Sequence, residues 1–208
     1  MIKSMLAGLV APLAALALTA GAAPDAPYTV TPGLFQPGLP DLGLTPASGT
    51  QTFTVFAPSQ TSDRFSNGVV LIPFKGKLYA QWQSSARDED SADTWVAYSV
   101  SADGEAWSPP VKLAPAGAGG LMRSSGGWHT DGETLIAYAN VWPEGFQSGA
   151  GGYTEYRTSR DGLTWSAPQR VTGADGKPVE GVIEQDPHVI DGRVPVSYTH
   201  LRAHETRE

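Results

Sequence analysis

Short apolar runs that alternate with turns fill the chain after residue 60. Residues 68–74 and 77–82 form two such runs on either side of Gly76, and residues 95–100 and 111–114 add two more. Runs of this length, bounded by turn-forming residues, are typical of β-strands. No helical stretch follows residue 22, so the pattern predicts four strands of one antiparallel sheet.

The same order of strands occurs a second time and begins a third. The second set comprises residues 126–140, 153–157 and 168–172. Spacings of 56 and 60 residues separate the glycines of corresponding turns, Gly76, Gly132 and Gly192. A sequence period of this size indicates repeated sheets, and antiparallel sheets repeated around an axis form a β-propeller.

A seven-residue motif separates the last two strands of each set. Ser-x-Asp-Gly-x-x-Trp begins at Ser101 and again at Ser159, 58 residues later, and Ser-x-Pro follows each copy. Ser and Asp side chains can hydrogen-bond turn amides, Gly accepts a positive φ, and Trp supplies a large apolar plug. We therefore expect two tight structural turns, built by Ser101, Asp103, Gly104 and Trp107 and by Ser159, Asp161, Gly162 and Trp165.

This motif resembles the Asp box, or bacterial neuraminidase repeat, of sialidase-like β-propellers. The resemblance implies an all-β propeller of sialidase type whose intact parent is six-bladed. Only two blades and the start of a third are expected in this chain, whereas a closed ring has four to eight. In that family the box is a structural turn remote from the active centre, so it indicates the fold without indicating the substrate.

The region before the propeller divides into two segments. Residues 1–22 are typical of a signal peptide, with Lys3 before an apolar run and small residues before a cleavage site near Ala22. The apolar run contains Pro12 and is shorter than the roughly 20 residues that span a membrane, so we expect a secreted or periplasmic protein without a stable membrane anchor. Residues 23–60 form a Pro/Gly-rich linker in which residues 51–56 alternate like a half-buried strand that could close the ring.

The partial propeller is expected over residues 61–195, and the rest of the chain differs from it. Residues 196–208 show no strand pattern and read like one frame of a transposon sequencing adapter translated as protein. We interpret this tail as an assembly artefact and the gene fragment as truncated near Pro195. His200 and His204 are therefore discounted as metal ligands, and we expect no metal and no other cofactor.

Composition limits the partners. The chain carries 14 Lys and Arg against 21 Asp and Glu, a formal net charge of −7, and no Cys. An acidic balance argues against nucleic acid or an anionic membrane as partner. Without Cys the protein has neither disulfides nor a lipidated Cys anchor. We expect a monomer whose partner is a glycan substrate.

The resemblance also implies catalytic residues. Sialidases hold the sugar carboxylate with three arginines, use an Asp as acid/base, and attack with a Tyr activated by a Glu. Arg87 and Asp93 lie at matching places on the connection after residues 77–82, and we assign both as catalytic candidates. The family's Arg-Ile-Pro is replaced here by Ser-Asn-Gly at residues 66–68, and Arg64 could substitute for the missing arginine. The alternative is a solvated acidic loop with Arg87 as its counter-ion.

Further substrate-binding candidates lie at equivalent depth in the next blades: Arg123, Trp128, His129, Glu184, Asp186 and His188. Asp186 and His188 could face the channel as acid and base, and Trp128 could stack on a sugar ring. The alternatives are a hydrogen-bonded structural histidine and a tryptophan that packs between blades.

Together these features predict a secreted exo-glycosidase of sialidase type that removes terminal sugars, sialic acid among them, from glycans. The remaining arginines, the Glu and the Tyr would lie in further blades, so the 208-residue chain alone is expected to be inactive. Two alternatives stay open. One is a lyase or neutral-sugar hydrolase that uses His188 or His129, and the other is a non-catalytic glycan-binding propeller.

Overall fold

The computed structural model describes residues 31–45, 47–148, 150–183, 186–187 and 198–199. The chain divides into two compact units, residues 1–50 and 51–208. The described residues of the first unit form successive turns. Residues 1–22, assigned above as a signal peptide, lie outside the described residues. Within the described part, no helix is both long and apolar enough to cross a membrane.

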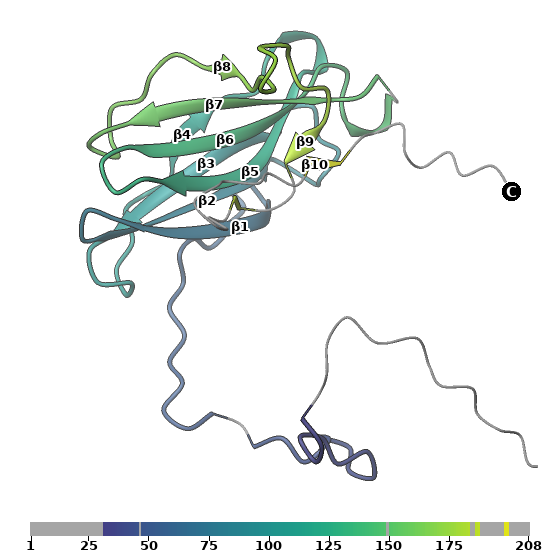
Figure 1. Cartoon of the computed structure of the whole chain (residues 1–208), viewed down its shortest axis with the longest axis vertical. Helices are drawn as coiled ribbons and strands as arrows, with labels where there is room; N and C mark the ends of the chain where they lie inside the picture. The colour runs from purple at the N-terminus through teal and green to yellow at the C-terminus, as the bar shows by residue number, and fades with distance from the viewer. Residues whose placement is uncertain (1–30, 46, 149, 184–185, 188–197, 200–208) are drawn as a thin grey trace, which may run out of the picture. The chain divides into compact units, whose positions relative to one another are not determined.

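The second unit contains two four-stranded antiparallel sheets, each with its strands in sequence order (Figure 1). The first sheet comprises β1 (Phe65–Phe74), β2 (Lys77–Ser85), β3 (Trp95–Ser101) and β4 (Val111–Ala114). The second comprises β5 (Met122–Thr130), β6 (Leu135–Trp142), β7 (Tyr153–Ser159) and β8 (Gln169–Arg170). These two blades confirm the all-β fold and the repeat.

Shorter elements complete the unit. Two 3-10 turns, η1 (Ala118–Gly120) and η2 (Phe146–Ser148), lie before β5 and after β6. A two-stranded ladder joins β9 (Val182–Ile183) to β10 (Tyr198–Thr199). The sequence predicts no strand at β10, because residues 196–208 lack the alternating pattern. Its two residues nevertheless pair with β9 through the main chain.

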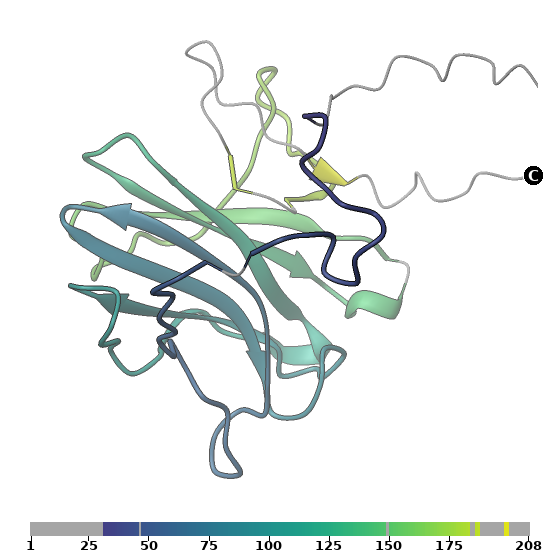
Figure 2. The ribbon, with the colours of Figure 1, turned by 90° about the horizontal axis from the view of Figure 1, so that it is seen from below.

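The two blades pack through β5, which lies against β1, β2 and β3 (Figure 2). Trp128 of β5 is only 1% exposed in this interface. Its ring lies edge-on to Tyr79 at 6.3 Å between centroids and 5.9 Å from Trp165 of the second box. Burying an aromatic side chain of this size stabilises the fold by about 2–3 kcal/mol. The interface between blades is therefore the main core of the unit.

The opposite face of the first blade is covered by residues 51–64. Phe56 stacks on Trp82 with 5.7 Å between ring centroids. Asp63 accepts hydrogen bonds from Trp95 Nε1 at 2.6 Å and from Ser84 Oγ at 2.9 Å. Residues 51–56, the candidate ring-closing strand, form no strand and make no main-chain ladder with any described residue. The partner expected for them belongs to a last blade, so this assignment stays a prediction. Val55 and Phe56 attach the segment to the blade by side-chain packing against Ala80, Trp82 and Ala97.

Each predicted box forms the expected turn. Asp103 Oδ1 accepts main-chain N–H bonds from residues 105 and 106 at 2.9 and 3.0 Å, and Ser101 Oγ accepts one from Gly104 at 2.7 Å. In the second box Asp161 and Ser159 repeat this pattern with distances of 2.7–2.8 Å. These N–H donors hold the pKa of both aspartates below the usual range. In both boxes the Ser and Asp side chains thus bind the turn amides, as a structural turn requires.

The serine that follows each tryptophan closes the turn, a role that the sequence analysis did not assign. Ser108 N donates to Val100 O at 2.9 Å, while Val100 N donates to Ser108 Oγ at 3.0 Å. Ser166 makes the same two bonds with Thr158, at 2.9 and 3.0 Å. The structural motif therefore extends one residue beyond Trp.

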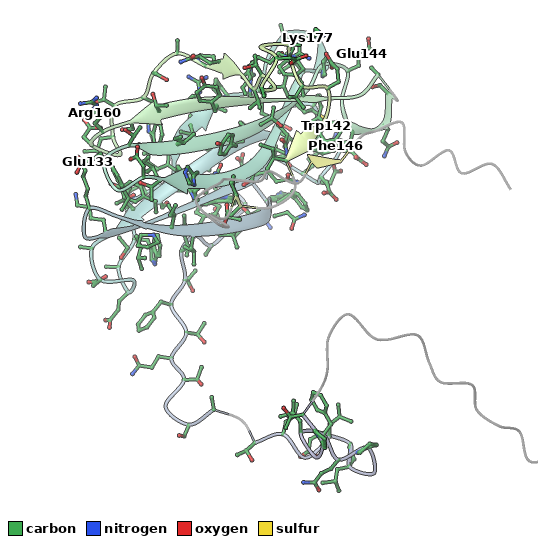
Figure 3. All side chains as sticks on the ribbon, in the orientation of Figure 1. Glu133, Trp142, Glu144, Phe146, Arg160 and Lys177 are labelled. Carbon is green, nitrogen blue, oxygen red and sulfur yellow. The ribbon has the colours of Figure 1, made fainter. Side chains whose placement is uncertain are left out.

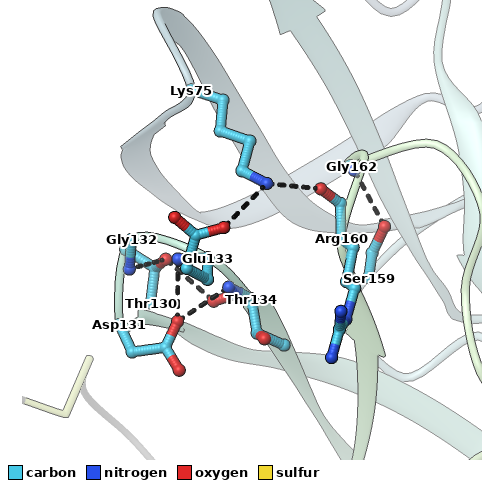
Figure 4. Close-up of polar contacts among 9 residues, drawn as sticks. All are labelled: Lys75, Thr130, Asp131, Gly132, Glu133, Thr134, Ser159, Arg160 and Gly162. Atoms are coloured by element: carbon cyan, nitrogen blue, oxygen red, sulfur yellow. Dashed lines mark hydrogen bonds and ion pairs between the residues drawn. The ribbon is translucent and has the colours of Figure 1, made fainter.

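The turns at this end also connect the blades (Figure 4). Lys75, in the β1–β2 turn, donates from Nζ to the carbonyl of Arg160 at 3.0 Å and pairs with Glu133 at 3.5 Å. Asp131, in the β5–β6 turn, accepts N–H bonds from Glu133 and Thr134 at 2.9 and 2.7 Å, much as the box aspartates do. This end of the two blades is a hydrogen-bonded set of turns.

Candidate functional site

The innermost strand of each blade carries a bulge at the same place. The register of β1 shifts between Asn67 and Val70, and that of β5 shifts between Ser125 and Trp128. Gly68 in the first bulge has φ 64° and Gly127 in the second has φ 90°, a backbone that glycine adopts readily. Bulges are common beside functional sites, where they redirect side chains and interrupt pairing.

A cavity of about 670 Å³ lies between these bulges. It is at the end of the blades where β2 and β6 finish, opposite the boxes, which follow the ends of β3 and β7. Its walls come from both bulges, from the connection between β2 and β3, from the end of β6 and η2, and from Asp186. The polar and aromatic side chains of the lining are Asn67, Gln83, Glu89, Asp90, Ser124, Ser125, Asn140, Trp142, Phe146 and Asp186.

Three carboxylates give the cavity its charge. Glu89 Oε1 is 3.5 Å from the amide nitrogens of both Asn67 and Gln83. Asp90 accepts a 2.6 Å bond from Gln147 Nε2, which joins the β2–β3 connection to η2 of the other blade. Asp186 Oδ1 accepts the main-chain N–H of residue 128 at 2.7 Å. Among the described lining residues there is no Arg, Lys or His.

One wall of the cavity is aromatic. Trp142 ends β6, and its Nε1 donates to Ser124 Oγ at 3.0 Å. Phe146 lies edge-on to the Trp142 ring, with centroids 4.9 Å apart and an interplanar angle of 85°. Asn140 is nearby but is fully engaged, because it exchanges hydrogen bonds with the main chain of Ile183 at 2.9 and 3.0 Å and so anchors β9.

The three residues assigned as catalytic do not line this cavity. Asp93 is exposed, and its Oδ2 accepts a 3.2 Å bond from the main-chain N–H of Ala86 within its own loop. Arg87 is exposed and forms no ion pair among the described residues. Arg64 is exposed, with Nη2 3.4 Å from Gln60 Oε1. The loop therefore resembles the solvated alternative, and its carboxylates that reach the cavity are Glu89 and Asp90.

Two of the substrate-binding candidates, Arg123 and Trp128, contact other parts of the protein and do not line the main cavity. Arg123 pairs with Glu155 at 3.4 Å and donates from Nη1 to the carbonyl of Pro115 at 2.6 Å, so its guanidinium is engaged away from the cavity lining. Trp128 is buried between the blades, and its Nε1 donates to Val70 O at 3.3 Å. These placements favour the packing alternative for Trp128, because its ring faces other aromatic side chains rather than solvent.

The remaining candidates divide by position. Asp186 lines the main cavity and also a second hollow of about 290 Å³, to which half-buried His129 contributes. The structure therefore places Asp186 and His129 in the lining of the same second hollow, whereas only Asp186 of the two also lines the main cavity. Glu184 and His188 lie outside the described residues. No group of three or more His, Asp or Glu suited to a metal ion occurs within the described part of the chain.

The amide and aromatic walls were not predicted from the sequence; they are formed by Asn67, Gln83, Trp142 and Phe146. Two glycines could have indicated the position of these walls. Gly68 and Gly127 lie 59 residues apart, nearly the spacing of the two boxes, and a glycine within a strand often marks a bulge. Reading both as bulges would have located the cavity. Nothing comparable in the sequence indicates the aromatic wall, because Trp142 simply continues the apolar pattern of β6.

The fold and the site define a class of protein: a propeller of antiparallel blades with Asp-box turns at one end and an acidic, aromatic cavity at the other. The chain matches the BNR repeat-like domain family over residues 76–208 and belongs to that family. This membership confirms the sialidase-type resemblance and a glycan-related fold. No curated protein matches the chain. The matched range includes residues 196–208, whose interpretation as an artefact stays a prediction.

Proposed function

We propose that this protein binds the terminal sugar of a glycan in the cavity between its two blades and takes part in hydrolysis of the glycosidic bond. The supporting observation is that carboxylates from two separate parts of the chain line the cavity, Glu89 from the first blade and Asp186 from the segment after β9. Most glycoside hydrolases use a pair of Asp or Glu residues as acid and base or nucleophile. Glu89 and Asp186 are the proposed pair.

The charge of the cavity favours a neutral sugar over sialic acid. A sialic acid would bring its own carboxylate beside Glu89, Asp90 and Asp186, and like charges this close together repel. No arginine fork is available in the described lining to compensate for that repulsion. A neutral sugar instead offers hydroxyl donors to these carboxylates.

One observation favours sialic acid as a second candidate. The main-chain N–H of Arg64 donates to the carbonyl of Ser85 at 3.1 Å, and Arg87 follows Ser85 by two residues. Both arginines thus belong to the end of the first blade from which Glu89 reaches the cavity. An incoming sialoside could recruit them from their exposed positions.

Two further proposals complete this picture. Export would follow cleavage near Ala22, and the protein would act as a monomer on extracellular or periplasmic glycans. Release of a mature chain beginning near residue 23, observed by mass spectrometry of exported protein, would support the first proposal. Light scattering of that chain tests the second.

The function is tested with a panel of neutral and sialylated glycans. Binding is measured on the 208-residue chain, and hydrolysis on the product of the longest reading frame at the locus, because the resemblance assigns part of the catalytic set to further blades. We expect binding of neutral-terminated glycans, and at least 100-fold slower hydrolysis in Glu89→Gln and Asp186→Asn. Glu105→Gln, an exposed carboxylate in the first box, is the matched control and should be unchanged.

The outcomes separate the candidate functions. Selective cleavage of sialosides that is lost in Arg64→Ala and Arg87→Ala would favour the second candidate. Glycan binding without hydrolysis would leave a non-catalytic glycan-binding propeller. Binding of no glycan in the panel would contradict the proposal.

A further inference from the structure

Trp142 is the large aromatic side chain that the cavity holds in a fixed orientation. It is half-buried, its Nε1 is bonded to Ser124, and its ring is buttressed edge-on by Phe146. Figure 3 shows Trp142 and Phe146 together at one end of the blades, with Glu133 and Arg160 at the other end. Because both contacts lie within its own blade, the indole is positioned before any ligand arrives.

The wall contributed by the first blade is polar. Asn67 and Gln83 present amide groups, and Glu89 lies between them with its Oε1 3.5 Å from each amide nitrogen. At this distance the hydrogen bonds between the amides and the carboxylate are weak, so each group can bond to a hydroxyl of a ligand instead. The cavity thus has an aromatic wall on one blade and a wall of hydroxyl-binding groups on the other.

The two walls are linked across the cavity. Gln147 follows Phe146 in η2 and donates to Asp90, which follows Glu89 on the first blade, at 2.6 Å. This bond ties the turn that supports the indole to the loop that carries the polar wall. The bond restrains the spacing between the two walls before a ligand binds.

We propose that Trp142 is a stacking platform for a neutral pyranose, whose C–H face lies on the indole while its hydroxyl edge bonds to Asn67, Gln83 and Glu89. This inference rests on the proposed function and specifies how the sugar is held. A pyranose has one face of C–H groups and a rim of hydroxyls, which matches the two walls. Phosphorylated or carboxylated ligands of similar size could also stack on the indole, but the three carboxylates of the cavity would repel their negative charge.

The platform is tested by calorimetric titration of the chain with methyl β-D-galactopyranoside and methyl β-D-glucopyranoside, and with N-acetylneuraminic acid as the anionic probe. Stacking that covers ~50 Å² of apolar surface corresponds to about a tenfold change in Kd. We expect Trp142→Ala to weaken binding of the neutral glycosides by about tenfold or more. Trp142→Phe, which keeps a ring, should weaken it by less than about threefold.

Two controls separate stacking from stability. Ser124→Ala removes the bond that orients the indole but keeps the ring, so it should weaken binding by less than Trp142→Ala does. Leu163→Ala alters a residue that is 61% exposed in the second box and should change nothing. Fluorescence adds a direct signature: saturating glycoside should shift tryptophan emission in the original chain and not in Trp142→Phe, although the variant still binds by calorimetry.

The possible results separate the stacking platform from the proposed function on which it rests. If a neutral glycoside binds but Trp142→Ala binds it equally well, or if the emission shift persists in Trp142→Phe, the platform is refuted while the proposed function stands. If none of the three probes binds the original chain, the proposed function itself fails. Should only N-acetylneuraminic acid bind, the neutral assignment is overturned.

Discussion

Replacement of Gly162 by alanine should report how strongly the second box holds the two blades together. Gly162 and Gly104 occupy the same position of the two boxes, with φ values of 71° and 82°. A side chain in this left-handed region costs about 1–2 kcal/mol at either site. At Gly104 the new Cβ would lie 3.2 Å from Leu78 Cδ1, the end of a flexible side chain. We therefore expect Gly104→Ala to lower the free energy of unfolding by about 1–2 kcal/mol.

Gly162→Ala meets a second obstacle. Its Cβ would overlap the ring of Tyr79, which belongs to the first blade and is 1% exposed. Tyr79 also donates to the carbonyl of Asp161 at 3.4 Å, so it cannot withdraw without loss. Overpacking of this kind adds about 1–3 kcal/mol, which raises the expected cost of Gly162→Ala to about 2–5 kcal/mol.

The assay is urea unfolding of both variants, alone and in a Tyr79→Leu background. Leucine lacks the ring atoms that the new Cβ would meet, so the excess cost of Gly162→Ala over Gly104→Ala should disappear in that background. Equal costs for the two alanines in the original chain would refute the reasoning. An excess that survives in Tyr79→Leu would locate its cause outside the contact between blades.

Three further predictions concern single side chains. N–H bonds lower the pKa values of Asp103 and Asp161 in the folded protein. Their stabilising contribution is therefore present above the unfolded pKa of about 3.9 and is lost as the pH falls below that value. Below this pH the melting temperature of Asp161→Asn should drop less steeply than that of the original chain. Arg123→Ala should cost about 2 kcal/mol in urea unfolding because it leaves Glu155 without its 3.4 Å partner, and a lost sugar affinity would contradict this structural role. Asn140→Leu should cost about 3 kcal/mol and increase hydrogen exchange at β9, because Ile183 loses both of its main-chain bonds to the amide; unchanged exchange would disprove the anchor.

The fold could be predicted because its determinants are local. A tight turn needs Ser, Asp and Gly at fixed offsets, and Asp103 and Asp161 bind the same N–H groups that the motif implies. The strand runs on either side of Gly76 and Gly132 are local in the same sense. Residues 51–56 mark the limit of this reasoning, since alternation reports one apolar face but not whether the main chain finds a partner.

The site could be predicted only in part because it depends on contacts between blades. The loop after β2 was identified, but which of its side chains reach the cavity is decided by packing: Glu89 and Asp90 do, and Asp93 bonds within the loop. Trp128 was identified as an aromatic residue at a suitable depth, yet the neighbouring blade covers it. Asp186, which the sequence offered as an acid that could face the channel, does line the cavity, and its role toward a substrate stays a prediction.

The separation between the two ends of the blades explains why the most informative motif says little about the ligand. β3 joins the cavity end to the first box and has seven residues, a distance of about 20 Å. At the box end the Ser and Asp side chains of the turns are engaged by main-chain N–H groups, which fixes the blade geometry. At the cavity end the bulges interrupt the ladder and expose amides and carboxylates that retain bonding capacity for a ligand. Substitutions at the boxes should therefore change stability without changing selectivity, while the lining residues can vary the sugar on an unchanged scaffold.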